Sequence, residues 1–464
     1  MARKIISSIC LISVALLFLT SCGADTYTTD EVFAWEWDMD APSPFEGETL
    51  TVATVWAREM INAAITGYVQ AGNRGVDINI TNLGSDLDRA SEQLGIQLMA
   101  GTAPMLIVGD IVDIHNPNTA QLFVDWIPIM RADPRFNEDA WAMNIIDGLS
   151  NDGALYAFPA SVFYNSIAVN NNVPGLVQAT SDLDVISLDD MIELHTQFSD
   201  QDKYMLWGFD VLFAVEANIG RFFDFSTQYV DFVSQEFIDL LNISKNLTSP
   251  SQTFGNRDFS MMSTRDAEIS AGSTYLFALS SNYSFQRFPV FEDEDPFVNP
   301  MFFVNGSGEI MITQQEYFAF ILNAQATPLQ RALAWDFVNS LIDTATIERH
   351  SGGWTFNLHH HVSKNLQEHH ANDIKANVAL QFFTSRAVPQ PWRLKGDWDD
   401  FSAVFLNQYT AAEQIPMTNA RYAPDMVTEA VFDILQQFHD GLITAETAAN
   451  DLQNRITLIL MEMG

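Results

Sequence analysis

"TLTVATVW" (residues 49–56) is a run of β-branched and apolar residues that is typical of a buried strand. Two helical stretches and two more strand-like runs follow it in alternation: "AREMINAAITGYVQAG" (57–72), "VDINITNL" (76–83), "LDRASEQLGIQLMAG" (87–101) and "PMLIVGD" (104–110). The order βαβαβ predicts a parallel sheet with right-handed crossover connections. This stretch therefore places the chain in the α/β class.

The same topology predicts where a ligand would bind. Ligands of open parallel sheets bind beyond the carboxyl ends of the strands. Trp56 and Asp110 stand at two of these ends, so they are candidate site residues.

Helix signals recur along the rest of the chain. In the second helical stretch Leu87, Ala90, Leu94 and Leu98 share one face, and Gly101 marks its end. Further helices are expected from their capping residues, which are Ser187, Thr327 (with Pro328 at the first helical position and Gln330 completing a capping box) and Thr444. The last helix has an apolar face made of Ala449, Leu452, Ile456 and Ile459. Strands are expected within 153–171 and 308–322, which leaves more helix than strand.

The N-terminus has the features of a cleaved leader. Arg3 and Lys4 precede an apolar run that is too short to be a dependable membrane span. "LTSC" (19–22) resembles the lipobox of bacterial lipoproteins, in which the cysteine is lipidated. We expect a signal peptide over 1–21, a lipidated Cys22 and a flexible tether over 22–47. The alternative is an ordinary secretory signal in which Cys22 is coincidental.

Charge narrows the set of partners. Without the leader, Lys+Arg falls from 22 to 20 against 59 Asp+Glu, a net charge of about −39. Such a surface repels nucleic acid and anionic lipid head groups, and no Lys/Arg cluster is present that would hold an anionic ligand. The two cysteines are Cys10 and Cys22, so the mature chain has no internal disulfide and depends on core burial.

In order along the chain, several segments are similar to those of extracellular solute-binding proteins of family 1, the maltose-binding-protein-like group of bacterial ABC importers. After the opening strand these segments are "GTAPMLIVGD" (101–110), "DGALYAFPASVFYNSIAVNNNV" (152–173), "AEISAGSTYLFAL" (267–279), "PLQRALAWDFVNSLID" (328–343), "HSGGWTFNL" (350–358) and "HDGLITAETAANDLQNRITLIL" (439–460). The departures are "TFNLHHHVSKN", which lacks the usual proline, and the acidic "FEDEDPF" (291–297).

The resemblance implies a periplasmic-binding-protein-like fold, with two α/β lobes, a central ligand cleft and hinge crossings. It implies lobe 1 over 48–158 and 272–318, and lobe 2 over 159–271 and 319–464. The function implied is capture of a neutral sugar or oligosaccharide and its delivery to the ABC permease subunits. The protein would be anchored through Cys22 to the outer face of the bacterial membrane, with no cofactor and no chemistry on the ligand.

The resemblance also implies further ligand-binding residues. A sugar cleft needs aromatic platforms with polar groups at the rim. To Trp56 and Asp110 we therefore add Tyr164, Asn165, Trp207, Tyr275, Trp354 and Tyr422. Each aromatic could instead belong to the core, because the chain contains 34 Phe, 11 Tyr and 10 Trp.

Other classes of function are retained as alternatives. The histidines at 359–361, 369 and 370 would suit a zinc-import lipoprotein, but adjacent histidines on one loop point in different directions, so no metal site is predicted. G-x-S-x-G, P-loop and G-x-G-x-x-G motifs are absent from the sequence, and no catalytic residue is predicted. A surface glycan-active enzyme needs only two facing carboxylates and stays an alternative, as does an adhesin.

Overall fold

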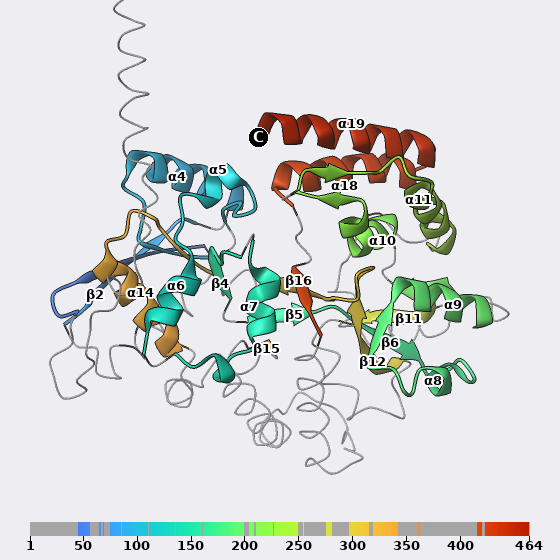
Figure 1. Cartoon of the computed structure of the whole chain (residues 1–464), viewed down its shortest axis with the longest axis horizontal. Helices are drawn as coiled ribbons and strands as arrows, with labels where there is room; N and C mark the ends of the chain where they lie inside the picture. The colour runs from blue at the N-terminus through green and yellow to red at the C-terminus, as the bar shows by residue number, and fades with distance from the viewer. Residues whose placement is uncertain are drawn as a thin grey trace, which may run out of the picture.

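The protein is built from two α/β lobes that lie side by side and are joined by crossing strands (Figure 1). This computed structural model describes residues 45–55, 65, 68, 75–84, 86–109, 111–134, 136–151, 153–159, 161–198, 204–207, 210–225, 227–248, 254, 275–280, 297–314, 319–341, 360–361, 415–419 and 423–463.

Lobe 1 is built on a sheet in which five described strands have the order β2-β1-β3-β14-β4. The strands are β1 Thr49–Thr54, β2 Asp77–Asn82, β3 Leu106–Val108, β4 Ala157–Pro159 and β14 Ala319–Leu322. β1 runs parallel to both β2 and β3, as the βαβαβ order predicts, and β14 is antiparallel to β3 and β4. The helices are α4 Leu87–Ala100, α5 Pro117–Ala120, α6 Trp126–Ala132, the 3-10 turn η1 Glu138–Ala140, α7 Met143–Leu149 and α14 Pro328–Leu341.

Helix α4 shows how local sequence sets an element. The Asp86 side chain accepts a hydrogen bond from the N–H of Arg89, and Gly101 ends the helix with a φ of 70°, which favours glycine. Ala90, Leu94 and Leu98 are buried, as expected. Leu87 is 39% exposed, contrary to expectation, because it is the first helical residue and lies beyond the turns that pack on the sheet.

Lobe 2 is built on a larger sheet, whose described strands have the order β15-β5-β13-β12-β6-β11-β8, with β7 paired to β12 and β16 paired to β13. The strands are β5 Ser161–Tyr164, β6 Ser166–Asn170, β7 Val185–Ser187, β8 Tyr204–Trp207, β11 Tyr275–Ser280, β12 Phe297–Val304, β13 Ile310–Gln314, β15 His360–His361 and β16 Met417–Asn419. A separate hairpin is formed by β9 Phe223–Asp224 and β10 Tyr229–Val230.

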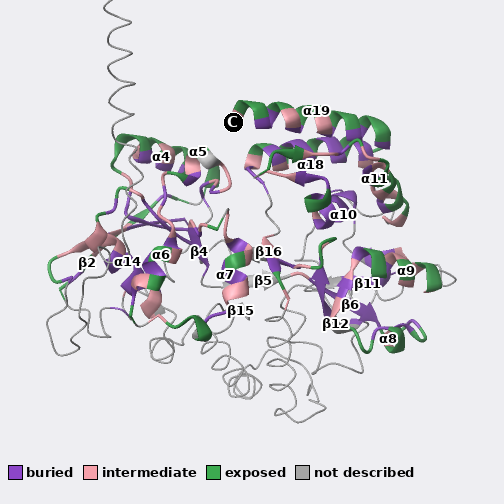
Figure 2. Cartoon of the chain, viewed as in Figure 1, coloured by how far each residue is buried: buried purple, intermediate pink, exposed green. Residues whose placement is uncertain are grey.

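Two groups of helices complete lobe 2. They are α8 Leu176–Ala179, α9 Leu188–Phe198, α10 Val211–Asn218, the 3-10 turn η3 Ile219–Arg221, α11 Gln235–Leu247, α18 Asp425–His439 and α19 Ala445–Met463. Helices α8 and α9 share a core with the sheet, and α11, α18 and α19 form a helical layer beside it (Figure 1). Helix α10 belongs to both, because one group of its residues is buried in the core of the sheet and another in the core of the helical layer. The buried stripe of α19 faces α18, and its outer side is exposed (Figure 2). The predicted caps Ser187, Thr327 and Thr444 and the apolar face of the last helix are confirmed.

Two of the crossings between the lobes run along neighbouring paths, and the chain passes from lobe 1 to lobe 2 once more between α14 and β15. β4 of lobe 1 leads into β5 of lobe 2, and β13 of lobe 2 leads into β14 of lobe 1. β5 is antiparallel to β13, and β4 is antiparallel to β14, so the two crossings lie next to each other. The change from the lobe 1 sheet to the lobe 2 sheet thus falls within 152–173, where a crossing was expected.

The expected return crossing at 267–279 and the division of 272–464 between the lobes are wrong in part. β11, β12 and β13 pair in the sheet of lobe 2, so the described strands of 272–318 belong there. β14 and α14 belong to lobe 1, although 319–464 was assigned to lobe 2. A short apolar strand looks the same whichever sheet it joins, and only its hydrogen-bonded neighbours distinguish the two cases.

The predicted tether also ends earlier than expected. Phe45 is 1% exposed and belongs to the core of lobe 1, and Gly47 donates a backbone hydrogen bond to Gly75 at 2.7 Å. The folded part therefore includes residues 45–47, and the rest of the predicted leader and tether lies outside the described residues. Among the helices that the structure describes, none combines the length and the apolar character needed to cross a membrane.

Asp125 leads to a prediction about pH. Its Oδ1 caps α6 by accepting the N–H groups of Ile127 at 3.0 Å and Leu155 at 2.9 Å. Burial raises the pKa of this carboxyl, and the two backbone donors and Arg131 reduce that rise. A raised pKa means that the native state binds the proton more tightly, so this contribution to stability declines as pH rises from about 4 through the raised pKa.

Asp125→Asn keeps the acceptor oxygen and removes the titration. We expect its free energy of unfolding at about pH 7 to equal or exceed that of the parent, with a shallower decline between about pH 4 and pH 7. Urea unfolding at both pH values measures this. A loss of more than about 1 kcal/mol at the higher pH would contradict the prediction, because it would mean that the charged cap is favourable.

Candidate functional site

The predicted site residues fall into two groups. Trp56, Asp110, Trp354 and Tyr422 lie outside the described residues, as does the predicted lipidation residue Cys22. The other four, which are Tyr164, Asn165, Trp207 and Tyr275, lie on strands of the lobe 2 sheet or directly beside them.

Trp207 and Tyr275 belong to neighbouring parallel strands. In the register of β8 with β11, Tyr204 is opposite Tyr275 and Trp207 is opposite Ala278. The rings of Tyr204 and Tyr275 lie 5.9 Å apart, with 43° between their planes. Tyr204 and Tyr275 begin their strands and Trp207 ends β8, so this strand pair carries aromatic residues at both ends, and aromatic residues are what a sugar-binding surface needs.

Sequence reasoning missed Tyr204. Its side chain is partly exposed, whereas Tyr275 is only 7% exposed and packs with Ala278 and Phe297. The Tyr275 backbone is also held, because Asn170 Nδ2 donates to its carbonyl oxygen at 2.5 Å. In this arrangement Tyr275 supports the surface and Tyr204 offers a more accessible ring. No local signal marked it, because Tyr204 and Trp207 are three residues apart and successive residues of a strand point to opposite faces of the sheet.

Tyr164 and Asn165 lie at the crossing. Tyr164 is opposite Ile312 in the β5–β13 register. The N–H of Asn165 donates to Met311 O at 3.0 Å, and Asn165 O accepts from the N–H of Phe303 at 2.9 Å. Tyr164 lies on β5, from which β13, β12 and β6 separate the β8–β11 pair. Asn165 immediately precedes β6, and β6 pairs with β11 through Ser166 and Ser280, so Asn165 lies nearer to that pair.

Two further contacts join the lobes. Helix α7 packs against β16 and β13, and Asn144 Nδ2 donates to Ile415 O at 3.3 Å. Elsewhere, the Asp113 side chain accepts the N–H of Asp425 at 3.1 Å. The lobes thus meet at the crossing strands and also at the N-terminal end of α18.

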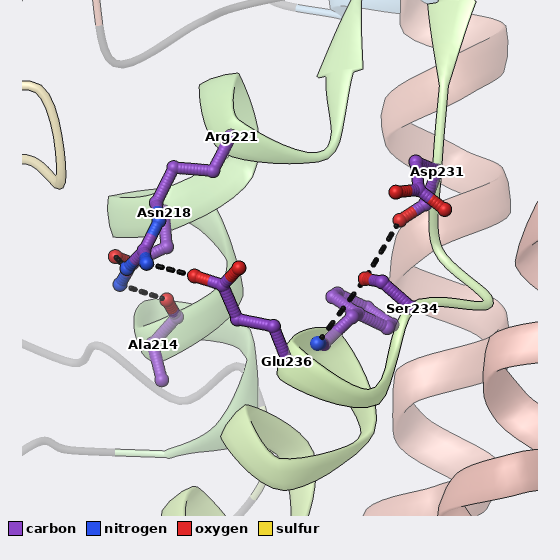
Figure 3. Close-up of polar contacts among 7 residues, drawn as sticks. Ala214, Asn218, Arg221, Asp231, Ser234 and Glu236 are labelled. Atoms are coloured by element: carbon purple, nitrogen blue, oxygen red, sulfur yellow. Dashed lines mark hydrogen bonds and ion pairs between the residues drawn. The ribbon is translucent and has the colours of Figure 1, made fainter.

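Polar side chains fasten the start of the helical layer (Figure 3). Arg221 forms an ion pair with Glu236 and donates to Asn218 Oδ1 at 3.3 Å, while Asn218 Nδ2 donates to Ala214 O at 3.0 Å. Ser234 Oγ donates to Asp231 O at 3.2 Å and accepts the N–H of Phe237 at the start of α11. These side chains form their hydrogen bonds and ion pair within the cluster and hold η3 to α11, so we assign them a structural role.

A surface groove of about 500 Å³ lies between the β9–β10 hairpin and α19. Its lining residues are Gln228, Val230, Gln453, Thr457, Leu460 and Met461. None of the four predicted site residues that the structure describes lines it. Gln453 joins its two walls by accepting from Phe232 N and donating to Val230 O.

The histidine-rich segment is described only in part. His360 and His361 form β15, opposite Val162 and Ser161 of β5, and the other histidines of 359–370 lie outside the described residues. Within the described part of the chain, no group of three His, Cys, Asp or Glu side chains is placed to hold a metal ion.

The fold matches those of extracellular solute-binding proteins. The sugar-binding protein MalE of Xanthomonas citri gives a TM-score of 0.59 at 12% identity, over 89% of this chain and 98% of that one. An extracellular solute-binding protein of family 1 from Alicyclobacillus acidocaldarius gives 0.55 at 13%, over 89% and 98%. An ABC transporter solute-binding protein from Agrobacterium radiobacter, in complex with ribitol, gives 0.55 at 16%, over 90% and 100%.

No family model and no curated protein matches the sequence. The structural matches confirm the predicted two-lobed, periplasmic-binding-protein-like fold. At these identities they establish the fold and leave the ligand to be proposed.

Proposed function

We propose that this chain is the lipid-anchored substrate-binding subunit of an ABC importer, and that it captures a neutral sugar, oligosaccharide or related polyol between its lobes. The observation that carries the proposal is the match of the whole two-lobed architecture, over 98–100% of the compared chains, to proteins that bind sugars or ribitol. An enzyme would need no such match, and the chain would deliver its ligand to the permease unchanged.

The described residues support a ligand of this kind. Tyr204, Trp207 and Tyr275 lie on adjacent strands of lobe 2, and aromatic rings suit the C–H faces of sugars. The net charge of −37 disfavours an anionic ligand. The adjoining crossings at β4–β5 and β13–β14 supply a joint about which lobe 2 could close on lobe 1.

Tryptophan fluorescence of residues 24–464, titrated with maltooligosaccharides, monosaccharides and ribitol, tests the proposal. We expect a saturable shift with one of these classes. Calorimetry should then show that Trp207→Ala and Tyr204→Ala each weaken binding about tenfold, since each removes a stacking surface. The matched control is Tyr229→Ala, which removes an exposed tyrosine of β10 and should leave the affinity unchanged.

Other results would favour the alternatives. Tight binding of ZnCl2, with no fluorescence change on addition of any sugar or polyol, would favour the hypothesis of a zinc-import lipoprotein. Release of shortened glycans would favour an enzyme. Binding to glycan surfaces, with no saturable binding of the soluble sugars or of ribitol, would favour an adhesin.

A further inference from the structure

Helix α18 takes its N-terminal cap from the other lobe. Its N-cap residue, Pro424, makes no side-chain capping hydrogen bond. The N–H of Asp425 donates instead to Asp113 Oδ2 at 3.1 Å, from a residue 312 positions earlier in the chain. By contrast, Asp86 caps α4 and Asp210 caps α10 from within their own segments.

Asp113 is fixed to lobe 1. It follows β3, and its neighbours Ile111, Val112 and Ile114 are buried in a core shared with that sheet and α4. Its Oδ1 also accepts the N–H of His115 at 3.1 Å, so one oxygen is held by its own loop while the other reaches α18.

Helix α18 is fixed to lobe 2. Its residues Val427, Ala430 and Val431 are buried against the helical layer that contains α10, α11 and α19. Figure 1 shows the N-terminal end of α18 beside α5 of lobe 1, apart from the strand β5 of the crossing. The hydrogen bond therefore joins two bodies at a point off the crossing strands.

This position has a mechanical consequence. The lobes are joined by the crossing strands and by the packing of α7 on β16 and β13, and the hydrogen bond of Asp113 is a separate contact. If the lobes rotate apart about the crossing strands, this hydrogen bond must break, unless the rotation axis passes through it as well. The contact is favourable, because the N-terminal end of a helix carries a partial positive charge and the carboxylate is negative.

Asp113 and Asp425 each follow a candidate site residue by three positions, Asp110 in lobe 1 and Tyr422 in lobe 2, so their contact joins the lobes on the side of the candidate cleft. We propose that this hydrogen bond is a latch that holds the two lobes in the closed arrangement in the protein without sugar. By raising the population of the closed arrangement, the latch strengthens ligand binding in the same proportion. The expected effect of the latch on the distance between the lobes is argued from the structure. Its expected effect on sugar affinity rests on the proposed function.

A distance measurement between the lobes tests the latch. Residues 24–464 contain no cysteine, so Met99→Cys on α4 and Leu442→Cys after α18 can carry two nitroxide labels. Both native side chains are exposed, at 82% and 73%. Without sugar, double electron–electron resonance should give one predominant distance, the shorter of the two populations, and Asp113→Ala should raise the ratio of longer to shorter distances about tenfold.

Two variants complete the experiment. Asp86→Ala removes the same kind of cap within lobe 1 and should leave the distances unchanged. Asp113→Asn retains an acceptor oxygen, so it should shift the distances in the same direction as Asp113→Ala but by less. This variant still tests the latch if Asp113→Ala does not fold. A long distance in the parent, or identical distributions in the parent and both Asp113 variants, would overturn the proposal.

The sugar titration is read separately. If Asp113→Ala opens the lobes but the parent binds no sugar, the result supports the latch and contradicts the proposed ligand class. If sugar binds the parent, and Asp113→Ala weakens that binding by the factor by which it lowers the closed fraction in the distance measurement, both are supported. If the parent binds sugar and the Asp113 variants show no change in lobe distance, the result contradicts the latch and supports the proposed function.

Discussion

Trp335→Ala is expected to lower the free energy of unfolding by about 5 kcal/mol, which is of the order of a whole domain's stability. Trp335 on α14 is fully buried, and its ring lies 6.3, 6.1 and 5.6 Å from those of Trp126, Trp141 and Phe158. Truncation leaves a large cavity at the centre of this cluster. It also removes a donor at 2.9 Å from the carboxylate of Asp133, which is only 2% exposed.

Trp335→Phe separates the two contributions. The phenyl ring fills most of the space but cannot donate to Asp133, so we expect a loss of about 1–3 kcal/mol. Met99→Ala on α4 is the surface control and should stay within about 0.5 kcal/mol of the parent, because this side chain is 82% exposed. Urea unfolding of residues 24–464, followed by circular dichroism, measures all three variants. A loss below about 2 kcal/mol for Trp335→Ala would show that the cluster collapses around the gap.

Features that depend on neighbours in the sequence were predictable. In the capping box of α14, Gln330 N donates to Thr327 Oγ1 and Thr327 N donates to Gln330 Oε1, and only four adjacent residues are needed to form it. The buried stripe of α19 follows helical periodicity in the same way. The parallel pairing of β1, β2 and β3 follows from alternating strands and helices.

Features that depend on distant partners were not predictable. β14 belongs to lobe 1 because Ile321 is opposite both Ile107 and Ala157, and no local pattern marks those pairs. The hydrogen bond from Asp425 to Asp113 spans 312 residues. The same limit applied to the candidate site, where Tyr204 emerges as a neighbour of Tyr275 only once β8 is placed beside β11.

Gly148→Ala is expected to destabilise the protein by about 1–3 kcal/mol, although alanine favours a helix over glycine by about 1 kcal/mol. Gly148 lies in α7 of lobe 1, and a Cβ added there would be 2.6 Å from the carbonyl oxygen of Met417 and 2.7 Å from its carbonyl carbon. These are backbone atoms of β16, and Met417 is opposite Ile310 of β13. The backbone of β16 cannot yield as a flexible side chain would, so the helix and the crossing strands must separate.

Gly95→Ala is the matched control. Gly95 also lies inside a helix, α4, but a Cβ there would have no atom within 4 Å, so only helix propensity acts. We expect this variant to gain about 0.5–1 kcal/mol, the opposite sign to Gly148→Ala. The urea midpoints of the two variants, measured under the same conditions, test whether their effects on stability have opposite signs. If Gly148→Ala is as stable as Gly95→Ala, then α7 can shift away from β16 without loss, and the contact between the lobes at this point is not rigid.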